Sequence, residues 1–307
     1  MRTSRTDLAM EAFQESGEGT LPGVSVSRWE TDGIAVTEVV VTDNEAARAL
    51  GKPRGSYLTL ESPLLRRRDP DARLAAAALL GEELGRLLPE DDGAPVLVIG
   101  LGNRAITPDA LGPGVIDRVL VTRHMLGGPY APANLRSVCA VAPGVLGITG
   151  IETLEMVKSV VSAVAPRAVI CIDSLAARDA GRIGSTVQLS DTGIQPGAGV
   201  GNRRMALTEA ALGVPVFSIG MPMVIYAATL ARDAFAWLSS QEGGEPPRDD
   251  ALSAMEQSLL GADIGEMIVT PREIDALVQD AAGIIASGIN RALQPRLSDA
   301  EIAAMMD

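Results

Sequence analysis

Short apolar runs recur along this chain and are separated by longer segments with helical periodicity. Residues 34–42 alternate apolar and polar side chains, which predicts a half-buried strand, and a second strand is expected at 57–60. Continuous apolar runs predict buried strands at 96–101, 119–122, 138–141, 168–172 and 214–219. Buried strands that alternate with helices are typical of a largely parallel sheet covered on both faces. We therefore expect an α/β fold, in which helices flank a mostly parallel or mixed sheet.

Three longer segments are expected to form helices, at 73–88, 221–240 and 271–293. Capping boxes, TGIE at 149–152 and TPRE at 270–273, predict two helix starts. Residues 241–250 (QEGGEPPRDD) are polar and rich in Gly and Pro, so we predict an exposed loop there.

The size and charge of the chain limit what it can be. Its 307 residues, of which 47% are hydrophobic, suit one large α/β domain. The net charge of −13 argues against direct binding to nucleic acid, which needs concentrated Lys and Arg. Nearly all the basic residues are Arg, and the only lysines are Lys52 and Lys158, which we interpret as codon bias.

The cysteines and the apolar runs predict a location in the cell. Cys139 and Cys171 both lie in apolar runs, which predicts two buried thiols in a reducing cytoplasm. No run has the length of a signal peptide core or of a membrane span. We therefore expect a cytoplasmic protein with no membrane partner.

The stretch VLVIGLGNRAITPDALGP (96–113) carries the first candidate site. Residues 100–105 fit G-x-G-x-x-A, the motif of a dinucleotide site, in which the helix begins within the motif. Here Thr107 as N-cap and Pro108 at the first helical position predict a later start, which places Asp109 in the first turn. Because a carboxylate there would repel a pyrophosphate, we interpret the loop as one that presents Asp109.

A second acid, Asp173, follows the apolar run 168–172. Active sites of open α/β sheets form at the carboxyl ends of the strands, so Asp109 and Asp173 are expected to converge if their strands are neighbours. Two close carboxylates share a proton, which supplies a base to activate water and an acid to protonate a leaving group. The alternatives are that Asp109 only stabilises a helix dipole and that Asp173 only caps the next turn.

The segment SDTGIQPGAGVGNRR (190–204) is a further candidate. Its D-T-G string is typical of aspartic proteases, but those are all-β proteins with two such loops, so we interpret Asp191 as part of an Asx-turn. Its glycines predict a shaped loop that brings backbone N–H groups close to a ligand, with a plain connection as the alternative. His124 is the only histidine, which argues against Ser-His, Cys-His and multi-histidine metal sites.

Eight longer strings occur in order along the chain. They are RTDLAMEA (5–12), YLTLES (57–62), GLGN with TPDALGP (100–113), TRH (122–124), APGVLGITGIET (142–153), IDSLAAR (172–178), SDTGIQPGAGVGNRR (190–204) and MIVTPREID (267–275). Together they resemble the spore germination protease family of endospore-forming bacteria. The resemblance implies an endopeptidase that degrades the small acid-soluble proteins coating spore DNA when germination begins. It also implies homotetramers in the cytoplasm of the forespore or spore core, and a fold similar to that of hydrogenase-maturation endopeptidases.

The resemblance further implies a zymogen that removes its own propeptide. It places the cut between Asp7 and Leu8, so that residues 1–7 are the propeptide and 8–307 are a single α/β peptidase domain. The segment TDLAME (6–11) then mimics the motif at which the family cuts its substrates. The alternative for this segment is a frayed acidic terminus.

The site residues follow from the same strings. The aspartates implicated in the family's catalysis fall on Asp109 and Asp173. Residues that bind substrate or shape the site are expected at Gly102, Asn103, Thr107, Arg178, Asp191, Gly193, Gly199, Gly201 and Asn202. Family members carry His where this chain has Gln195, which argues against a metal at that position, and we expect no metal and no nicotinamide or other cofactor. The alternatives are a nucleotide-binding oxidoreductase built on 100–105 and a non-catalytic spore protein with this fold.

Overall fold

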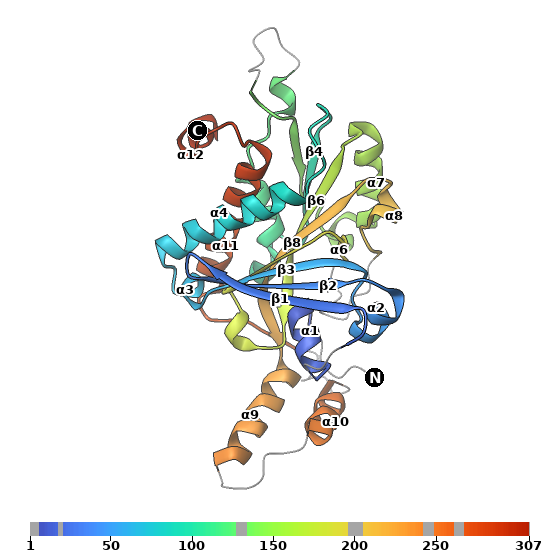
Figure 1. The fold of residues 1–307 in the computed structure, drawn as a ribbon, viewed down its shortest axis with the longest axis vertical. Coiled ribbons are helices and arrows are strands. Elements are labelled where there is room, and N and C mark those ends of the chain that lie inside the picture. The colour runs from blue at the N-terminus through green and yellow to red at the C-terminus, as the bar shows by residue number, and fades with distance from the viewer. Residues whose placement is uncertain are drawn as a thin grey trace.

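The fold is built on one mixed sheet with helices on both faces (Figure 1). The computed structural model describes residues 6–17, 21–126, 134–195, 205–241, 249–260 and 267–306. Within these residues the strands follow the order β1-β2-β3-β7-β8-β6-β4-β5, and β9 pairs with β8. The expected α/β fold with a mixed sheet flanked by helices is confirmed.

The element bounds are as follows. The strands are β1 (Val24–Thr31), β2 (Ile34–Val41), β3 (Gly55–Glu61), β4 (Val96–Gly100), β5 (Val138–Val141), β6 (Ala168–Ala177), β7 (Thr186–Ser190), β8 (Val216–Tyr226) and β9 (Ile268–Val269). The helices are α1 (Ala9–Glu15), α2 (Asn44–Leu50), α3 (Pro63–Arg66), α4 (Pro70–Leu87), α5 (Leu111–Ile116), α6 (Leu146–Thr149), α7 (Thr153–Val164), α8 (Glu209–Leu212), α9 (Ala227–Gln241), α10 (Asp249–Leu260), α11 (Ile274–Leu293) and α12 (Asp299–Met306). Short 3-10 turns are η1 (Thr107–Asp109), η2 (Arg123–Met125) and η3 (Ala180–Arg182).

The sheet has a parallel half and an antiparallel half. Strands β8, β6, β4 and β5 pair in parallel, whereas β1, β2, β3, β7 and β8 pair antiparallel. Strand β6 has parallel neighbours on both sides and helices over both faces, so nearly all of its residues are buried. This explains why its sequence reads as a continuous apolar run.

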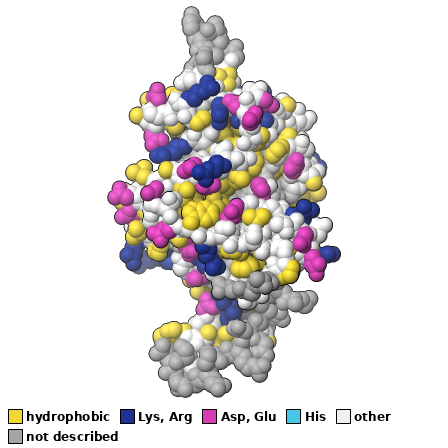
Figure 2. All heavy atoms as spheres, in the orientation of Figure 1, with side chains coloured by type: hydrophobic (Ala, Val, Ile, Leu, Met, Phe, Trp, Pro, Cys, Tyr) yellow, Lys and Arg dark blue, Asp and Glu magenta, His cyan; other side chains and the backbone are white. Residues whose placement is uncertain are grey.

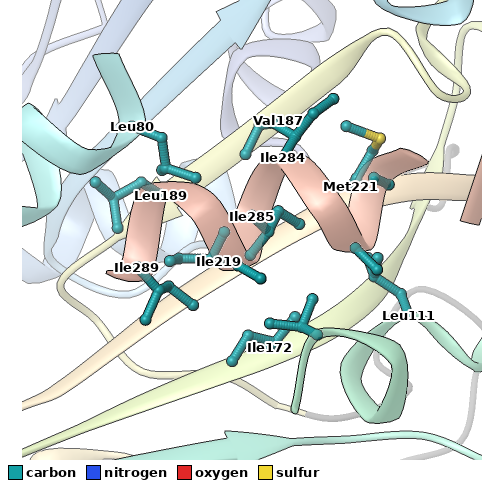
Figure 3. Packing of buried hydrophobic residues seen from close by; sticks show 14 of the residues in the cluster. Leu80, Leu111, Ile172, Val187, Leu189, Ile219, Met221, Ile284, Ile285 and Ile289 are labelled. Carbon is teal, nitrogen blue, oxygen red and sulfur yellow. The ribbon is translucent and has the colours of Figure 1, made fainter. Parts of the chain in front are cut away.

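Helix α11 carries the largest core of the described residues, packed with α4 and α5 against one face of the sheet. In Figure 3 its side chains Ile284, Ile285 and Ile289 lie against Leu189 of β7 and Ile219 of β8. The helix buries this stripe because its apolar residues recur with a period near 3.6.

The opposite face of the sheet is covered by two separate apolar clusters. One packs α7 onto β4 and β6 and includes Cys171, and the other packs α1 and α2 onto β2 and β3 and includes Leu8 and Leu175. Side chains of alternate residues in β6 point to the same face, so Asp173 lies between Cys171 and Leu175. The two clusters therefore meet at Asp173.

Two predictions of strands and helices are wrong. Residues 119–122 are not a strand: the Leu120 N–H donates to Asn290 and the Thr122 N–H to the Val138 carbonyl, so each backbone group finds a different partner. Residues 221–226 belong to β8 and not to a helix, because periodicity cannot distinguish a buried strand from a buried helix in a continuous apolar run.

Neither capping box begins a helix. Helix α7 begins at Thr153, and the Thr149 hydroxyl accepts from the Ile151 N–H. Helix α11 begins at Ile274, and the Thr270 hydroxyl donates to the Met223 carbonyl. Neither threonine hydroxyl therefore caps the helix that follows it: Thr149 closes the end of α6, and Thr270 bonds to β8.

The remaining global expectations concern thiols, membranes and charge. Cys139 and Cys171 are free; burial, with the negative charge of Asp173 as a second cause, raises the pKa of the Cys171 thiol. None of the helices in the described part of the chain is long and apolar enough to cross a membrane. On the face shown in Figure 2, acidic and basic side chains are interspersed, and the basic ones form no continuous stripe. The predicted loop at 241–250 lies mostly outside the described residues, between α9 and α10, which project together from the body in Figure 1.

The packing of α11 makes a testable prediction. Ile285 is fully buried, so Ile285→Ala leaves a cavity and should lower the free energy of unfolding by about 2–5 kcal/mol. Leu74→Ala on α4 is the control, because Leu74 is 60% exposed and its loss should cost less than about 0.5 kcal/mol. Urea unfolding measures both variants, and equal effects would contradict the assignment of α11 to the core.

Candidate active site

The glycine loop after β4 closes on Asp109. Gly102 has a φ of +112°, and a Cβ there would lie 2.0 Å from the Asp109 carbonyl oxygen, so only glycine fits. The next N–H, of Asn103, donates to the Asp109 carbonyl at 3.0 Å and to its Oδ2 at 2.8 Å. The loop therefore uses its backbone to hold Asp109, which is the interpretation favoured by the sequence.

The local geometry of this loop differs from the expected helix start in one respect. Thr107 is not an N-cap; it begins the 3-10 turn η1, and its carbonyl accepts from the Ala110 N–H. The helix α5 begins only at Leu111. Asp109 consequently sits at the end of a tight turn, because the chain must reverse between β4 and α5 within a few residues.

Asp173 lies within β6 and not at its carboxyl end. The strand continues to Ala177, but its neighbour β4 ends at Gly100, opposite Ile172. Asp173 is therefore the first residue beyond the end of β4, and it is only 6% exposed. Cα atoms of η1 come within 8 Å of Cα atoms in β6 and in β8. The turn that carries Asp109 thus lies beside the strand that carries Asp173.

A polar row crosses the sheet at this level. In the strand register Gly220 of β8 pairs with Gln188 of β7 on one side and with Asp173 on the other. Neighbouring strands are about 4.8 Å apart, so the two polar side chains flank a gap about two strand spacings wide, and the Leu175 side chain packs over Gly220 within it. A cavity of about 170 Å³ opens at this gap, and Tyr57, Lys52 and Asp7 also line it.

The beginning of the chain occupies this region. The Asp7 N–H donates to the Ala176 carbonyl at 3.0 Å, and the Ala176 N–H donates to Asp7 Oδ2 at 2.8 Å. Asp7 thereby bonds to β6 beyond the end of β4. Leu8 and Ala9, which follow, are fully buried. The alternative of a frayed terminus is wrong for these residues.

The carbonyl of Asp7 receives two side-chain donors. Lys52 Nζ lies 2.7 Å from the Asp7 carbonyl oxygen, and Gln188 Nε2 lies 3.2 Å from it. Gln188 Oε1 accepts from the Ala9 N–H at 2.8 Å. The carboxamide of Gln188 therefore bonds to the chain on either side of the Asp7–Leu8 peptide bond, at the Asp7 carbonyl and at the Ala9 N–H.

Glu11 fastens the same segment to the end of β6. Its side chain is 1% exposed and accepts from the N–H groups of Arg178 and Asp179, at 2.8 and 2.9 Å. Arg182 Nη1 donates to it at 2.8 Å. The charge of Arg182 and the two backbone donors together replace the water that a buried carboxylate loses.

The other expected site residues are only partly brought together. Thr192 and Gly193 line the cavity, whereas Asp191 accepts from the Ser56 N–H at 2.8 Å and so joins the end of β7 to β3. Arg178 pairs with Glu15 of α1 at 2.9 Å, so its side chain holds the N-terminal helix. Gly199, Gly201 and Asn202 lie outside the described residues.

Tyr57 and Gln195 both line the cavity. Burial raises the pKa of Tyr57 to about 12, so its hydroxyl stays protonated and donates to the Pro53 carbonyl at 2.8 Å. Gln195, which stands where the family resemblance leads one to expect His, lines the cavity. In the part of the chain that the structure describes, no three His, Cys, Asp or Glu side chains gather as metal ligands would.

Several residues of this region carry no sequence motif. Gln188 lies with Thr186 and Ser190 as alternate polar positions in a buried strand, and this pattern could have marked the polar row. Lys52 is one of two lysines in an arginine-rich chain, a peculiarity interpreted above as codon bias. Glu11 had no signal of its own beyond the resemblance.

Comparisons with known proteins agree on one family. A sequence profile described as germination protease matches residues 4–262. The germination protease of Caldanaerobacter subterraneus subsp. tengcongensis is 43% identical over 98% of this chain and 98% of its own length. The germination protease of Clostridium tetani is 41% identical over 99% of both chains, and that of Bacillus mycoides is 35% identical over 95% of this chain and 94% of its own.

Similarity to solved structures is illustrated by one hydrogenase maturation protease. It is the NiFe hydrogenase maturation protease HycI of Thermococcus kodakarensis, with a TM-score of 0.30 and 16% identity, covering 64% of this chain and 92% of that one.

The buried carboxylate of Glu11 makes a testable prediction. Glu11→Gln keeps the shape of the side chain but leaves Arg182 without its nearest counter-charge, so the free energy of unfolding should fall by about 3 kcal/mol. Glu15→Gln is the matched control, because its pair with Arg178 is 25% exposed and is expected to contribute less than about 1 kcal/mol. Urea unfolding compares them; a Glu11 variant as stable as the Glu15 variant would refute the buried clamp.

Proposed function

The chain belongs to the germination protease family, and we propose that it is the endopeptidase that begins the degradation of small acid-soluble proteins on spore DNA during germination. That it is a peptidase follows from its family; the substrate class is our proposal. The single observation that carries it is the Asp7–Leu8 peptide bond, which Lys52 and Gln188 hold at a cavity that Asp173 also lines. A stretch of protein chain is thus seated where a peptide substrate of this enzyme would lie.

Hydrolysis in this proposal uses the two aspartates. One of Asp109 and Asp173 acts as the base that takes a proton from water, and the other protonates the leaving nitrogen. A water oxygen bonds to the peptide carbon, the C–N bond breaks, and the products are a carboxylic acid and an amine. The position of η1 beside β6 supports the pairing of these residues.

The chain in this proposal is made as a zymogen. Residues 1–7 are the propeptide, and 8–307 form the peptidase domain. While Asp7 is bonded to Ala176, an incoming substrate cannot use the same backbone groups of β6, so the uncut chain is inactive toward other proteins. Homotetramers in the forespore or spore core, without a direct nucleic-acid or membrane partner, complete the proposal by likeness to the family.

The rival functions have less support. A dinucleotide site on 100–105 would need free backbone N–H groups at the loop, but the Asn103 N–H is bonded to Asp109. A non-catalytic spore protein is tested by incubation with a purified small acid-soluble spore protein, followed on a gel. Fragments that accumulate with time support the peptidase, and an intact partner after long incubation would support the non-catalytic alternative.

Self-processing gives the first prediction of this proposal. The full-length chain, held in mildly acidic, dehydrating buffer, should lose residues 1–7 and begin at Leu8, because this bond lies at the site. Intact-mass spectrometry identifies the new N-terminus. A mature chain that begins elsewhere, or full activity of the uncut chain toward a protein substrate, would refute the zymogen proposal.

The aspartate pair gives the second. Asp109→Asn and Asp173→Asn should each slow the cleavage of the 7–8 bond by at least about 100-fold, because asparagine neither accepts nor releases the proton. Asp71→Asn, an exposed position in the first turn of α4, should cleave at the unaltered rate. Near-normal cleavage by either site variant would remove that residue from the mechanism.

The loss of an aspartate would also weaken a metal site, so the same rate is measured after dialysis against EDTA. Since we propose no catalytic metal, the rate should not change. Full inhibition that added zinc reverses would show that the aspartates act through a metal.

A further inference from the structure

We propose that Lys52 and Gln188 form the oxyanion hole for cleavage of the 7–8 peptide bond and of the corresponding bond in a protein substrate. The inference rests on the proposed function, because it concerns the same site and the same reaction. In this inference two residues that belong to no recognised motif of the chain stabilise the negative charge of the transition state.

The first observation is the pair of donors on one carbonyl oxygen. Lys52 reaches the Asp7 oxygen from the loop between α2 and β3 at 2.7 Å, and Gln188 reaches it from β7 at 3.2 Å. Preorganised donors stabilise an oxyanion at about 2.7–3.1 Å, so Lys52 already lies within this range of the ground-state oxygen and Gln188 lies just beyond it. A charged donor makes a stronger bond than a neutral one, and the bond strengthens as the oxygen gains charge.

The second observation is that the bound segment itself orients the donor of Gln188. Its Oε1 accepts from the Ala9 N–H at 2.8 Å, which turns Nε2 toward the Asp7 oxygen. Gln188 is buried, in register with Gly220, and the Leu175 side chain packs over that glycine. The carboxamide therefore needs no reorganisation when the reaction begins.

The third observation is that Lys52 binds two successive carbonyls. Its Nζ lies 3.2 Å from the Thr6 oxygen as well as 2.7 Å from the Asp7 oxygen. The Thr6 contact fixes the ammonium group beside the reacting carbonyl. Leu8 and Ala9 are fully buried on the other side of the bond, and the scarcity of water there strengthens the attraction between charge and oxyanion.

The step that these residues assist is the addition of water. A water oxygen, after loss of its proton to an aspartate, bonds to the Asp7 carbonyl carbon, and the π electrons of the C=O bond move to the oxygen. Lys52 and Gln188 stabilise this negative charge through one hydrogen bond each, without giving up a proton. The C=O bond then re-forms, the C–N bond breaks, and the Leu8 nitrogen takes a proton to become an amine.

The test uses self-cleavage of the full-length chain, followed by intact-mass spectrometry. Lys52→Met should slow the loss of residues 1–7 by about 100- to 1000-fold, and Lys52→Arg, which keeps a charged donor, should recover part of that loss. Gln188→Met, which has similar length and no donor, should slow cleavage by about 100-fold. Lys158→Met is the matched control, because the other lysine of the chain is exposed on α7 and should have no effect.

A second readout separates catalysis from docking. Hydrogen exchange of the backbone N–H groups of 10–13, which lie beyond the contacts of both residues, reports whether α1 stays in place. Slow cleavage with unchanged protection at 10–13 supports the oxyanion hole. Slow cleavage with protection lost in proportion shows that the residues only dock the segment, and it overturns the inference.

The remaining outcomes distinguish this inference from the proposed function. If Lys52→Met and Gln188→Met both cleave within about threefold of the unaltered chain, the oxyanion hole is overturned while the peptidase function stands. If the unaltered chain never cleaves the 7–8 bond, the self-processing proposal and this inference both fail. If Asp109→Asn and Asp173→Asn still cleave, only the proposed aspartate mechanism is refuted.

Discussion

Strand β6 extends past its neighbour β4, and its exposed backbone groups must find other partners. Beyond Ile172 the parallel ladder to β4 stops, in the interior of the molecule. An unpaired buried N–H or C=O group costs about 1–3 kcal/mol, so the edge of residues 173–177 cannot remain bare. Asp7 satisfies both groups of Ala176, and Glu11 satisfies the N–H groups just after the strand. In the proposed function an extended peptide substrate uses the same edge, so a structural need and the proposed peptide site coincide there.

The sequence predicts well the strands that are covered on both faces and the helix that buries one regular apolar stripe. The run 168–172 reads as a strand because β6 is covered on both faces, and the stripe of α11 repeats with the helical period. The predictions fail where burial hides the period, as in residues 221–226, or where a threonine that resembles a cap bonds elsewhere. Local pattern therefore identified most strands, and its largest error in length is at β6 and β8, which continue as buried strands past their predicted ends.

The candidate site divides in the same way. Asp109 could be singled out because its glycine loop is contiguous with it, and Asp173 because it follows an apolar run. Lys52 and Gln188 could not be singled out, because they are separated from Asp7 by 45 and 181 positions of the chain, respectively. No local sequence pattern reports contacts over such separations. Only a strand register can show that Gln188, Gly220 and Asp173 lie in one row.

The distance along the chain between Asp7 and Ala176 also sets an order of events during synthesis. The first residues to leave the ribosome have no partner until β6 and β7 have followed them. At about 5–20 residues per second, that interval is on the order of ten seconds or more. The cavity cannot close around Gly220 until still later, when β8 is made. A nascent chain of this protein thus carries its N-terminal segment long before it possesses the groups of β6 and β7 that hold it.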